Sequence, residues 1–362
     1  MMERFRKAAV LLLAILIILS SCATTEGESY PSVSGTIVSM SKYGNAMTSI
    51  TSEEMKAAGY QAGDLIAITV GDYSAIVPLG TNYSDVDRSS AVAVDDGNAI
   101  ELAINYGDFS SVSGCSEGTA VTVSMAEKGG YSEEFMIRHL VRTENRDDYA
   151  SDAVFANFRE VTVGNIKSGV LYRSCSPVRG DARAPYADAL MGEAGIKTVI
   201  NLADSEESMS EGLAIAPNYA VLYENGSVIC LNMGVDFFAP DFTAKLHDAL
   251  VFMIENPGPY LIHCNEGKDR AGMVTATLEA ISGATMDEIV ADYMTSYENY
   301  YGTEKGTEQY DAIANIIRDF FTDMNGKPFP AASVGTVAEV YLENTVGLEK
   351  AQIEALKAIL TE

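Results

Sequence analysis

The segment Tyr260–Gly272, with the sequence YLIHCNEGKDRAG, restricts the fold more than any other part of this 362-residue chain. A short apolar run ends in a cysteine, a five-residue turn follows, and an arginine opens a helical pattern. Periodicity and turn residues of this kind predict a strand, a tight loop and a helix in direct succession. Such a loop can hold a thiolate beneath a ring of backbone N–H groups, with a guanidinium facing the same point.

Strands and helices alternate on both sides of this segment, which predicts an α/β domain over residues 146–362 with a mostly parallel central sheet flanked by helices. Val170–Ser174, Thr198–Leu202 and Tyr260–His263 are the expected strands. Asp241 is the expected N-cap of one helix. The predicted helices are Pro185–Gly195, Phe242–Glu255, Ala271–Ser282, 285–300, 307–324, 335–343 and Glu349–Leu360.

Residues 33–141 have a different pattern, because short apolar or alternating runs are separated there by Gly and Asp turn residues. Five or more such runs in about a hundred residues favour a small antiparallel barrel or sandwich. The charged stretch Arg142–Asp148 marks the expected domain boundary. The runs are Thr36–Met40, Asp64–Val70, Ser74–Pro78, Ile100–Ile104 and Ala120–Ser124.

The N-terminus predicts a targeting segment. Basic residues in Met1–Lys7 precede the apolar run Ala8–Leu19, which is short for a membrane span and leads to Cys22. Residues 1–22 resemble a bacterial lipoprotein signal, in which Cys22 is lipidated, and residues 23–32 are the expected tether. We therefore expect an extracytoplasmic protein attached by lipid to the bacterial cell membrane or outer membrane.

The formal charge of −27 argues against nucleic acid as a partner, because nucleic-acid affinity depends on cationic contacts with phosphates. A phosphate-binding pocket must then be a local positive site. Four cysteines remain after Cys22, and an extracytoplasmic location would permit a disulfide among them. Cys175 and Cys230 are candidates to protect Cys264 reversibly, and core thiols are the alternative for these two and for Cys115.

The chemistry of the loop indicates an anion site with a nucleophile at its base. The N-terminus of a helix carries unpaired N–H groups and a partial positive charge, which bind phosphate and favour a thiolate. Arg270 offers a planar fork to two phosphoryl oxygens, and Lys268 adds positive charge at the loop rim. His263 would orient the loop and help to keep the sulfur ionised, or it is a structural histidine at a strand end.

The loop His263–Arg270 resembles the signature of cysteine-dependent protein tyrosine phosphatases, in a bacterial branch with lipid and phosphotyrosine activity. The resemblance extends over roughly 150–362, through Asn157–Glu160, Gly169–Ser174, Gly195–Glu207 and Asp287–Met294. It implies phosphomonoester hydrolysis through a cysteinyl-phosphate on Cys264, with no metal or cofactor. Substrates would be a phosphorylated protein, a lipid or an inositol phosphate. The implied binding residues are His263, Asn265, Glu266, Gly267, Lys268 and Ala271.

Three aspartates are candidates for the general acid that protonates the leaving oxygen. Asp269 comes first, because the resemblance implicates the aspartate of the loop. Asp236 lies 28 residues before Cys264, about where the superfamily places its acid loop, and Asp204 follows a predicted strand. For each of them the alternative is a solvated surface carboxylate.

Ala271 departs from the family pattern, which has Ser or Thr after the arginine to donate a hydrogen bond to the departing thiolate. Alanine removes this donor, so we expect slower hydrolysis of the phosphoenzyme. An alternative function follows, in which a lipid-anchored protein binds phosphorylated ligands with little turnover.

Residues 33–141 resemble the C-terminal barrel of S-adenosylmethionine hydrolases and halogenases. The matching segments are Gly35–Val38, Tyr43–Ile50, Val77–Pro78, Tyr83–Val86 and Leu102–Gly107. The larger N-terminal domain of that family, which supplies half of the nucleoside pocket, has no counterpart here. A non-catalytic barrel is therefore expected, with a nucleoside-binding or partner-binding module as a further alternative.

Overall fold

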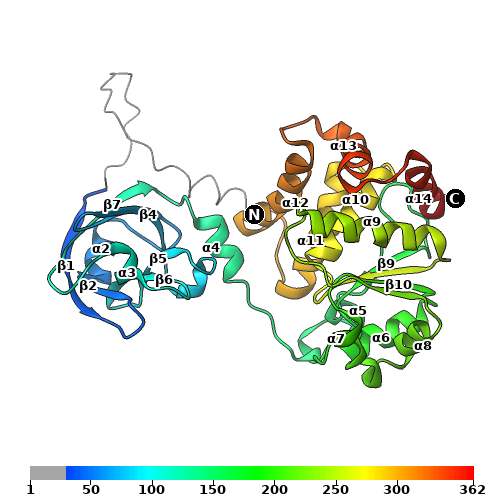
Figure 1. Cartoon of the computed structure of the whole chain (residues 1–362), viewed down its shortest axis with the longest axis horizontal. Helices are drawn as coiled ribbons and strands as arrows, with labels where there is room; N and C mark the ends of the chain where they lie inside the picture. Colours follow the sequence, from blue (N-terminus) through cyan, green and yellow to red (C-terminus); the bar gives the residue numbers. More distant parts are fainter. Residues whose placement is uncertain (1–29) are drawn as a thin grey trace. The chain divides into compact units, whose positions relative to one another are not determined.

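The computed structural model describes residues 30–362, which form two compact units that divide between Leu140 and Val141 (Figure 1). The expected signal segment, with Cys22, lies outside the described residues. Among residues 30–362, no helix has both the length and the apolar character that crossing a membrane requires.

The first unit is a closed seven-stranded barrel, which confirms the prediction of a small β domain. Its strands follow the order β1-β2-β6-β5-β4-β3-β7 and pair antiparallel, except for a short parallel contact between β4 and β5. The strands are β1 Val33–Met40, β2 Ala46–Thr51, β3 Leu65–Val70, β4 Tyr73–Gly80, β5 Ala91–Asp95, β6 Ala99–Ile104 and β7 Ala120–Glu127, and the helices are α2 Ser52–Ala57, α3 Phe109–Ser113 and α4 Ser132–Arg138.

Alternation of side chains explains why these short runs close into a barrel. Along β7, Val121 and Val123 are buried while Ala120 and Thr122 face outward. Ile66 and Ile68 alternate in the same way along β3 and pack in the same core. Residues two apart on a strand share one face, so each strand contributes one apolar row to the interior.

The second unit contains a five-stranded sheet in the order β11-β10-β12-β9-β8. The pairs among β9, β10, β11 and β12 are parallel, and β8 is antiparallel at one edge, which confirms the mostly parallel sheet. All residues of β10 and β12 are buried, as expected for parallel strands that are covered on both faces. The strands are β8 Arg159–Glu160, β9 Leu171–Ser174, β10 Thr198–Asn201, β11 Val228–Cys230 and β12 Tyr260–His263.

Helices cover both faces of this sheet (Figure 1). Val199 and Leu261 pack with Met191 and Tyr219, from α6 and α8, on one face. Contacts with α9 and α10 cover the other face. The helices are α5 Asp152–Phe155, α6 Ala184–Glu193, α7 Glu206–Ser210, α8 Pro217–Glu224, α9 Pro240–Glu255, α10 Arg270–Ile281, α11 Met286–Tyr301, α12 Glu308–Asn325, α13 Val334–Tyr341 and α14 Lys350–Thr361.

The prediction that Asp241 caps α9 is wrong. The N-cap is Ala239, and Asp241 lies in the first turn, where its carboxylate is 2.8 Å from the Lys245 ammonium. Pro240 explains the shift, because its fixed φ and missing N–H suit the first helical position. The helix therefore begins two residues earlier than its apolar spacing indicates.

Candidate active site

Cys264 lies at the carboxyl end of the parallel sheet, directly after β12. This strand lies between β10 and β9, and α10 begins six residues later at Arg270. The Cys264 side chain is buried, with 2% of the residue exposed. Carboxyl ends of parallel strands are the usual place for ligands in such sheets, because the following loops converge there.

The carbonyl groups of the loop point outward to fixed donors. The Asn265 carbonyl accepts from the Ser176 N–H at 3.1 Å. The Glu266 carbonyl accepts from the Asn157 amide at 3.0 Å and from the Tyr300 hydroxyl at 2.7 Å. These donors come from segments before β8, after β9 and at the end of α11, so several parts of the domain shape the loop together.

Arg173, on β9, fixes the next two carbonyls. Its guanidinium donates to the Gly267 carbonyl at 2.8 and 3.2 Å and to the Lys268 carbonyl at 3.2 Å. Arg173 is almost fully buried, and its Nη1 lies 2.6 Å from the Asp292 carboxylate on α11. Arg159 binds the same carboxylate at 2.8 Å. Burial alone would raise the pKa of Asp292, but the charges of Arg159 and Arg173 outweigh it and hold this pKa well below its usual range.

Four consecutive carbonyls are thus held from outside the loop. In a trans peptide the C=O and the N–H point in opposite directions, so outward carbonyls direct the intervening N–H groups inward. Successive N–H groups that face one concavity form an anion site. The geometry therefore supports the phosphate-binding loop that the sequence predicts.

Gly267 is required by close backbone packing as well as by conformation. Its φ is +67°, in the left-handed region. A Cβ atom at this position would lie 2.1 Å from the Ser174 carbonyl oxygen, which belongs to the backbone of β9 and cannot move aside cheaply. Any other residue would separate the loop from the sheet.

The Arg270 guanidinium is anchored at the first turn of α10. Its Nη1 donates to the Met233 carbonyl at 2.8 Å and, more weakly, to the Leu202 carbonyl at 3.4 Å. These carbonyls belong to the segments that follow β11 and β10. The guanidinium is therefore fixed between the carboxyl ends of the strands.

His263 is a buried residue whose ring is neutral at pH 7. Burial lowers its pKa to about 4, and the nearby charge of Asp204 opposes this effect. Its Nε2 lies 3.3 Å from the Tyr219 hydroxyl, and its Nδ1 lies 3.5 Å from the Cys264 carbonyl. A neutral ring cannot attract a thiolate by its charge, so the geometry supports the orienting role of His263 rather than the ionising one.

Lys268 is less available than its position in the sequence indicates. Its ammonium lies 3.1 Å from the Asp269 carboxylate and 3.6 Å from that of Glu266. It also lies 4.8 Å from the centre of the Tyr297 ring, and its side chain is only 13% exposed. The charge of the lysine is therefore largely compensated in this state by two carboxylates and an aromatic face.

The three candidate acids occupy different settings. The Asp269 side chain is 46% exposed and lies in the loop itself, beside Lys268. Asp236 is exposed, in a segment whose Phe237 and Phe238 rings pack against α12. Asp204 accepts from the Asn201 amide at 3.1 Å. Asp269 is the one of the three that lies within the loop.

Ala271 is fully buried in the first turn of α10. No hydrogen bond to the Cys264 sulfur occurs within residues 30–362. The cysteines of the described residues are free thiols. Burial raises the pKa of Cys175 well above its usual range and that of Cys230 to about 12, so both are weak nucleophiles in this state.

Sequence reasoning missed Asn157, Arg173, Asp292 and Tyr300 as residues that shape the site. The first three lie in segments that carry the family resemblance, but none has a role that its residue type reveals. The available signal was an arginine inside a predicted strand of a sheet flanked by helices, because a charge buried in such a sheet needs partners.

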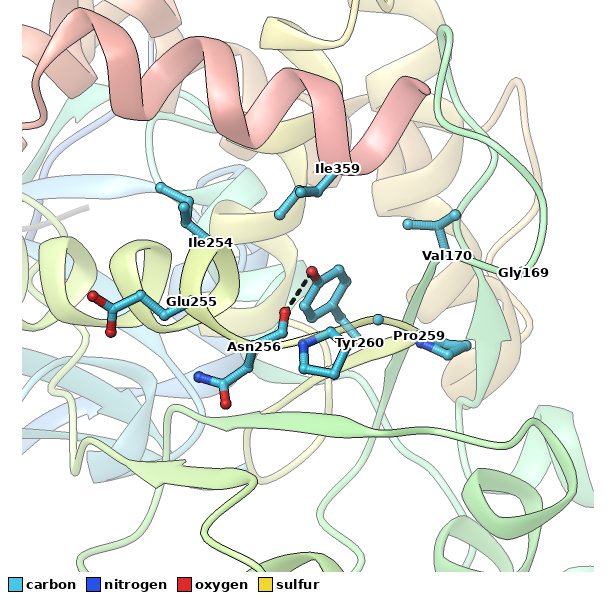
Figure 2. A pocket seen from close by; sticks show the side chains of 10 residues that line it. Gly169, Val170, Ile254, Glu255, Asn256, Pro259, Tyr260 and Ile359 are labelled. Carbon is cyan, nitrogen blue, oxygen red and sulfur yellow. Dashed lines mark hydrogen bonds between the residues drawn. The ribbon is translucent and has the colours of Figure 1, made fainter.

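A pocket of about 600 Å³ lies away from this site (Figure 2). Val170, Pro259 and Tyr260 line it at the amino ends of β9 and β12, together with Ile359 of α14. Tyr260 donates from its hydroxyl to the Asn256 carbonyl at 2.8 Å. Cys264 is at the opposite end of β12.

Within the described chain, no group of three or more His, Cys, Asp or Glu side chains is placed to hold a metal ion.

Comparison with known proteins gives matches for both units. Residues 35–122 match the C-terminal domain of SAM hydroxide adenosyltransferases, and residues 154–362 match the tyrosine phosphatase family. A search of curated proteins found no match. An uncharacterized conserved protein from Thermotoga maritima is 22% identical, with a TM-score of 0.25. The match covers 30% of this chain and 42% of that protein.

Two further solved structures match this chain at low identity. The core catalytic domain of the PP-IP phosphatase SIW14 from S. cerevisiae, in complex with citrate, is 19% identical with a TM-score of 0.28, and the match covers 47% of this chain and 93% of that one. TpbA from P. aeruginosa, in complex with pTyr, is 18% identical with a TM-score of 0.26, over 45% and 96% of the two chains. The family match covers more than half of the chain, which therefore belongs to the tyrosine phosphatase family.

Proposed function

We propose that this protein hydrolyses phosphomonoesters through a cysteinyl-phosphate on Cys264. The observation that carries the proposal is the loop itself, in which four outward carbonyls direct the backbone N–H groups toward the inside of the loop that begins at Cys264. The start of α10 adds the positive end of a helix dipole, and Arg270 adds a guanidinium. This arrangement favours the trigonal phosphoryl group of an in-line transfer.

The reaction proceeds in two displacements. The Cys264 thiolate attacks phosphorus, the bond from phosphorus to the ester oxygen breaks, and the leaving oxygen takes a proton from a carboxylic acid. Water then attacks the cysteinyl-phosphate and gives up a proton to the same carboxylate, and inorganic phosphate leaves as the thiolate re-forms. We propose Asp269 as this acid because it lies in the loop, with Asp236 next and Asp204 third.

The decisive experiment measures hydrolysis of a generic aryl phosphate by two proteins that both lack residues 1–22. One has the parent sequence and the other carries Cys264→Ser. The serine variant should lose activity by at least about a thousandfold, because an alcohol at neutral pH is a far weaker nucleophile than a thiolate. Cys230→Ser is the matched control and should retain activity. Equal rates in the two serine variants would exclude the cysteine mechanism.

Phosphotyrosine, phosphoinositides and inositol phosphates are the proposed substrate classes. Lys268 is the residue that separates them, because its ammonium can leave its carboxylate partners to meet a second phosphate. Lys268→Ala should therefore reduce activity on polyphosphorylated headgroups by about tenfold more than on a simple aryl phosphate. A uniform loss across the panel would contradict this assignment.

A second candidate function is the capture of phosphorylated ligands with little turnover, which Ala271 specifically favours. The loop would then bind phosphate as described, while the phosphoenzyme persisted. Rapid-mixing kinetics distinguish the two functions: a burst with steady turnover indicates a phosphatase, and a single stoichiometric burst indicates capture.

We also propose that Cys22 carries a lipid and that the protein works outside the cytoplasm. The support is the sequence pattern of residues 1–22 alone. Mass spectrometry of the protein expressed in a bacterial host tests this directly. A diacylated N-terminal peptide beginning at Cys22 is expected, whereas an unmodified cysteine would overturn the anchor.

A further inference from the structure

The segment that precedes the matched phosphatase domain contacts the loop His263–Arg270, called the nucleophile loop below. The family match begins at residue 154, yet Arg142 places its Nη1 2.8 Å from the Glu266 carboxylate. The Arg142 guanidinium also lies over the Tyr300 ring, 4.9 Å from its centre. Tyr300 in turn donates to the Glu266 carbonyl. The main chain of Glu266 is therefore held by a hydrogen bond, and its side chain by an ion pair without hydrogen-bond geometry.

Several contacts anchor the same segment to the second unit, so the position of Arg142 is well defined. The buried Arg183 guanidinium donates to the Thr143 carbonyl at 2.7 Å and to the Tyr149 hydroxyl at 2.9 Å. It also forms an ion pair with Glu144, which accepts a hydrogen bond from Arg142 at 3.2 Å. These contacts place a guanidinium beside the loop from outside the matched domain.

Glu266 is the reason why a cation is needed there. It lies two residues after Cys264, in a loop that must attract a dianion, and its side chain is 31% exposed. Lys268 also faces this carboxylate, at 3.6 Å, but Lys268 is closer to Asp269, at 3.1 Å. Without Arg142, the Glu266 carboxylate would have only the Lys268 ammonium as a cationic partner, and that ammonium is closer to Asp269. The negative charge that remained on Glu266 would repel a phosphate ester.

We propose that Arg142 is a positioning residue of the phosphate site, which neutralises Glu266 and keeps its carboxylate directed away from the bound phosphate. This inference rests on the proposed function, because it takes the loop as the phosphate site. Arg142 already has partners in Glu266, Glu144 and Tyr300, so its role is exerted through Glu266 rather than by direct contact with the substrate.

The test measures the affinity for inorganic phosphate by calorimetry, and the KM and kcat for an aryl phosphate, on the full chain in detergent. Arg142→Ala should weaken phosphate binding and raise KM by about fivefold, with kcat within about twofold of the parent, since partly exposed ion pairs rarely exceed a tenfold effect. Arg142→Lys should retain most of the affinity. Arg146→Ala is the matched control, because it removes a cation of the same segment that pairs with Asp152 instead of the loop.

A double variant separates charge from packing. If Arg142 acts by neutralising Glu266, then Arg142→Ala combined with Glu266→Gln should recover phosphate affinity to within about twofold of the parent. Unchanged affinity in Arg142→Ala, an equal loss in Arg146→Ala, or a loss that Glu266→Gln does not restore would each overturn the inference. The role of Arg142 can be tested even if the parent chain does not turn over, because phosphate binding is measured directly. If the parent is fully active and Arg142→Ala binds phosphate as well as the parent does, the role of Arg142 is excluded while the proposed function remains. A parent chain that does not bind phosphate overturns both proposals.

Discussion

At the scale of single residues, the site is built from a loop whose chemistry is visible in the sequence and from supports that are not. Cys264, Gly267 and Arg270 have residue types and spacing that indicate an anion site. Arg173 and Tyr300 are common residue types whose roles depend on which loop carbonyl they face. That information exists only after the chain has folded, so the supports could not be predicted from the sequence.

Ala271 gives the sharpest kinetic prediction. Ala271→Ser should accelerate breakdown of the phosphoenzyme by about ten- to a hundredfold, because a hydroxyl in the first turn of α10 could donate to the departing sulfur. The burst rate should change little. Rapid-quench measurement of both phases checks this expectation, with Ala276→Ser on the same helix as the control.

Ala271 is fully buried, so the added oxygen must also fit. Thermal unfolding of both serine variants shows whether a rate change reflects chemistry or strain. A stable Ala271→Ser variant with an unchanged second phase would contradict the proposed role of the missing donor.

The lowered pKa of His263 leads to a prediction of how the free energy of unfolding depends on pH. Its pKa in the folded state is about 4, below the value of about 6.5 expected in the unfolded chain. Between these values the unfolded chain binds more protons, so stability is full above pH 6.5 and falls as the pH is lowered toward 4. Denaturant unfolding from pH 7.5 to 4 should show this slope.

In a His263→Gln variant, the dependence of the unfolding free energy on pH should decrease by the equivalent of up to one proton. The variant will also be less stable at every pH. His247→Gln is the control, because His247 lies on the surface of α9 with 35% of its side chain exposed. Identical slopes in the parent and in His263→Gln would remove His263 as the cause.

At the scale of elements, apolar runs predicted strands and helices well where they were long or continuous. β12 has the predicted bounds, because the apolar run YLI follows a Gly-Pro pair and ends at His263, before the turn that begins with Cys264. The three-residue β11 and the short helices α7 and α8 were missed, since runs of this length carry little periodicity. In the barrel, β2 and β5 were missed, and pairing with neighbouring strands defines them.

The contact between β9 and α11 supports a stability prediction. Arg173→Met should destabilise the second unit by about 3 kcal/mol or more, because it removes a buried partner of Asp292 and leaves two loop carbonyls without donors. Phosphate affinity should fall in the molecules that remain folded. Chemical denaturation and calorimetry measure the two effects, and the half-buried control Arg318→Met on α12, which loses only a weak contact with Asn315, should leave both nearly unchanged.

At the scale of the whole molecule, the described chain separates into a barrel and a phosphatase unit. The sequence predicted both architectures, because alternating β runs and α/β alternation are distinct patterns. The contacts of the connecting segment could not be predicted in the same way. The charged stretch Arg142–Asp148 is typical of a solvated linker. In the structure it packs on the second unit, because Thr143 accepts a hydrogen bond from Arg183 and Arg142 forms an ion pair with Glu266.

This connection determines where the chain can be cut. A fragment of residues 141–362 should fold and retain the proposed phosphatase activity, because its core and site are complete. A fragment of residues 154–362 should be markedly less stable and bind phosphate more weakly, because buried Arg183 loses three of its partners. Circular dichroism and phosphate titration compare the two, and equal behaviour would show that residues 141–153 are dispensable.

The outward-facing carbonyls of the nucleophile loop also determine how this protein should fail. Their donors belong to the strand Arg173 occupies, to the segment holding Asn157 and to the end of α11, so the ring around Cys264 stays in shape only while sheet, entry segment and C-terminal helices are assembled together. Loosening any one of them would open the ring before the domain itself melts. Loss of the proposed activity should therefore precede loss of the helical signal during gradual denaturation, so that activity would report on the native fold more sensitively than circular dichroism does.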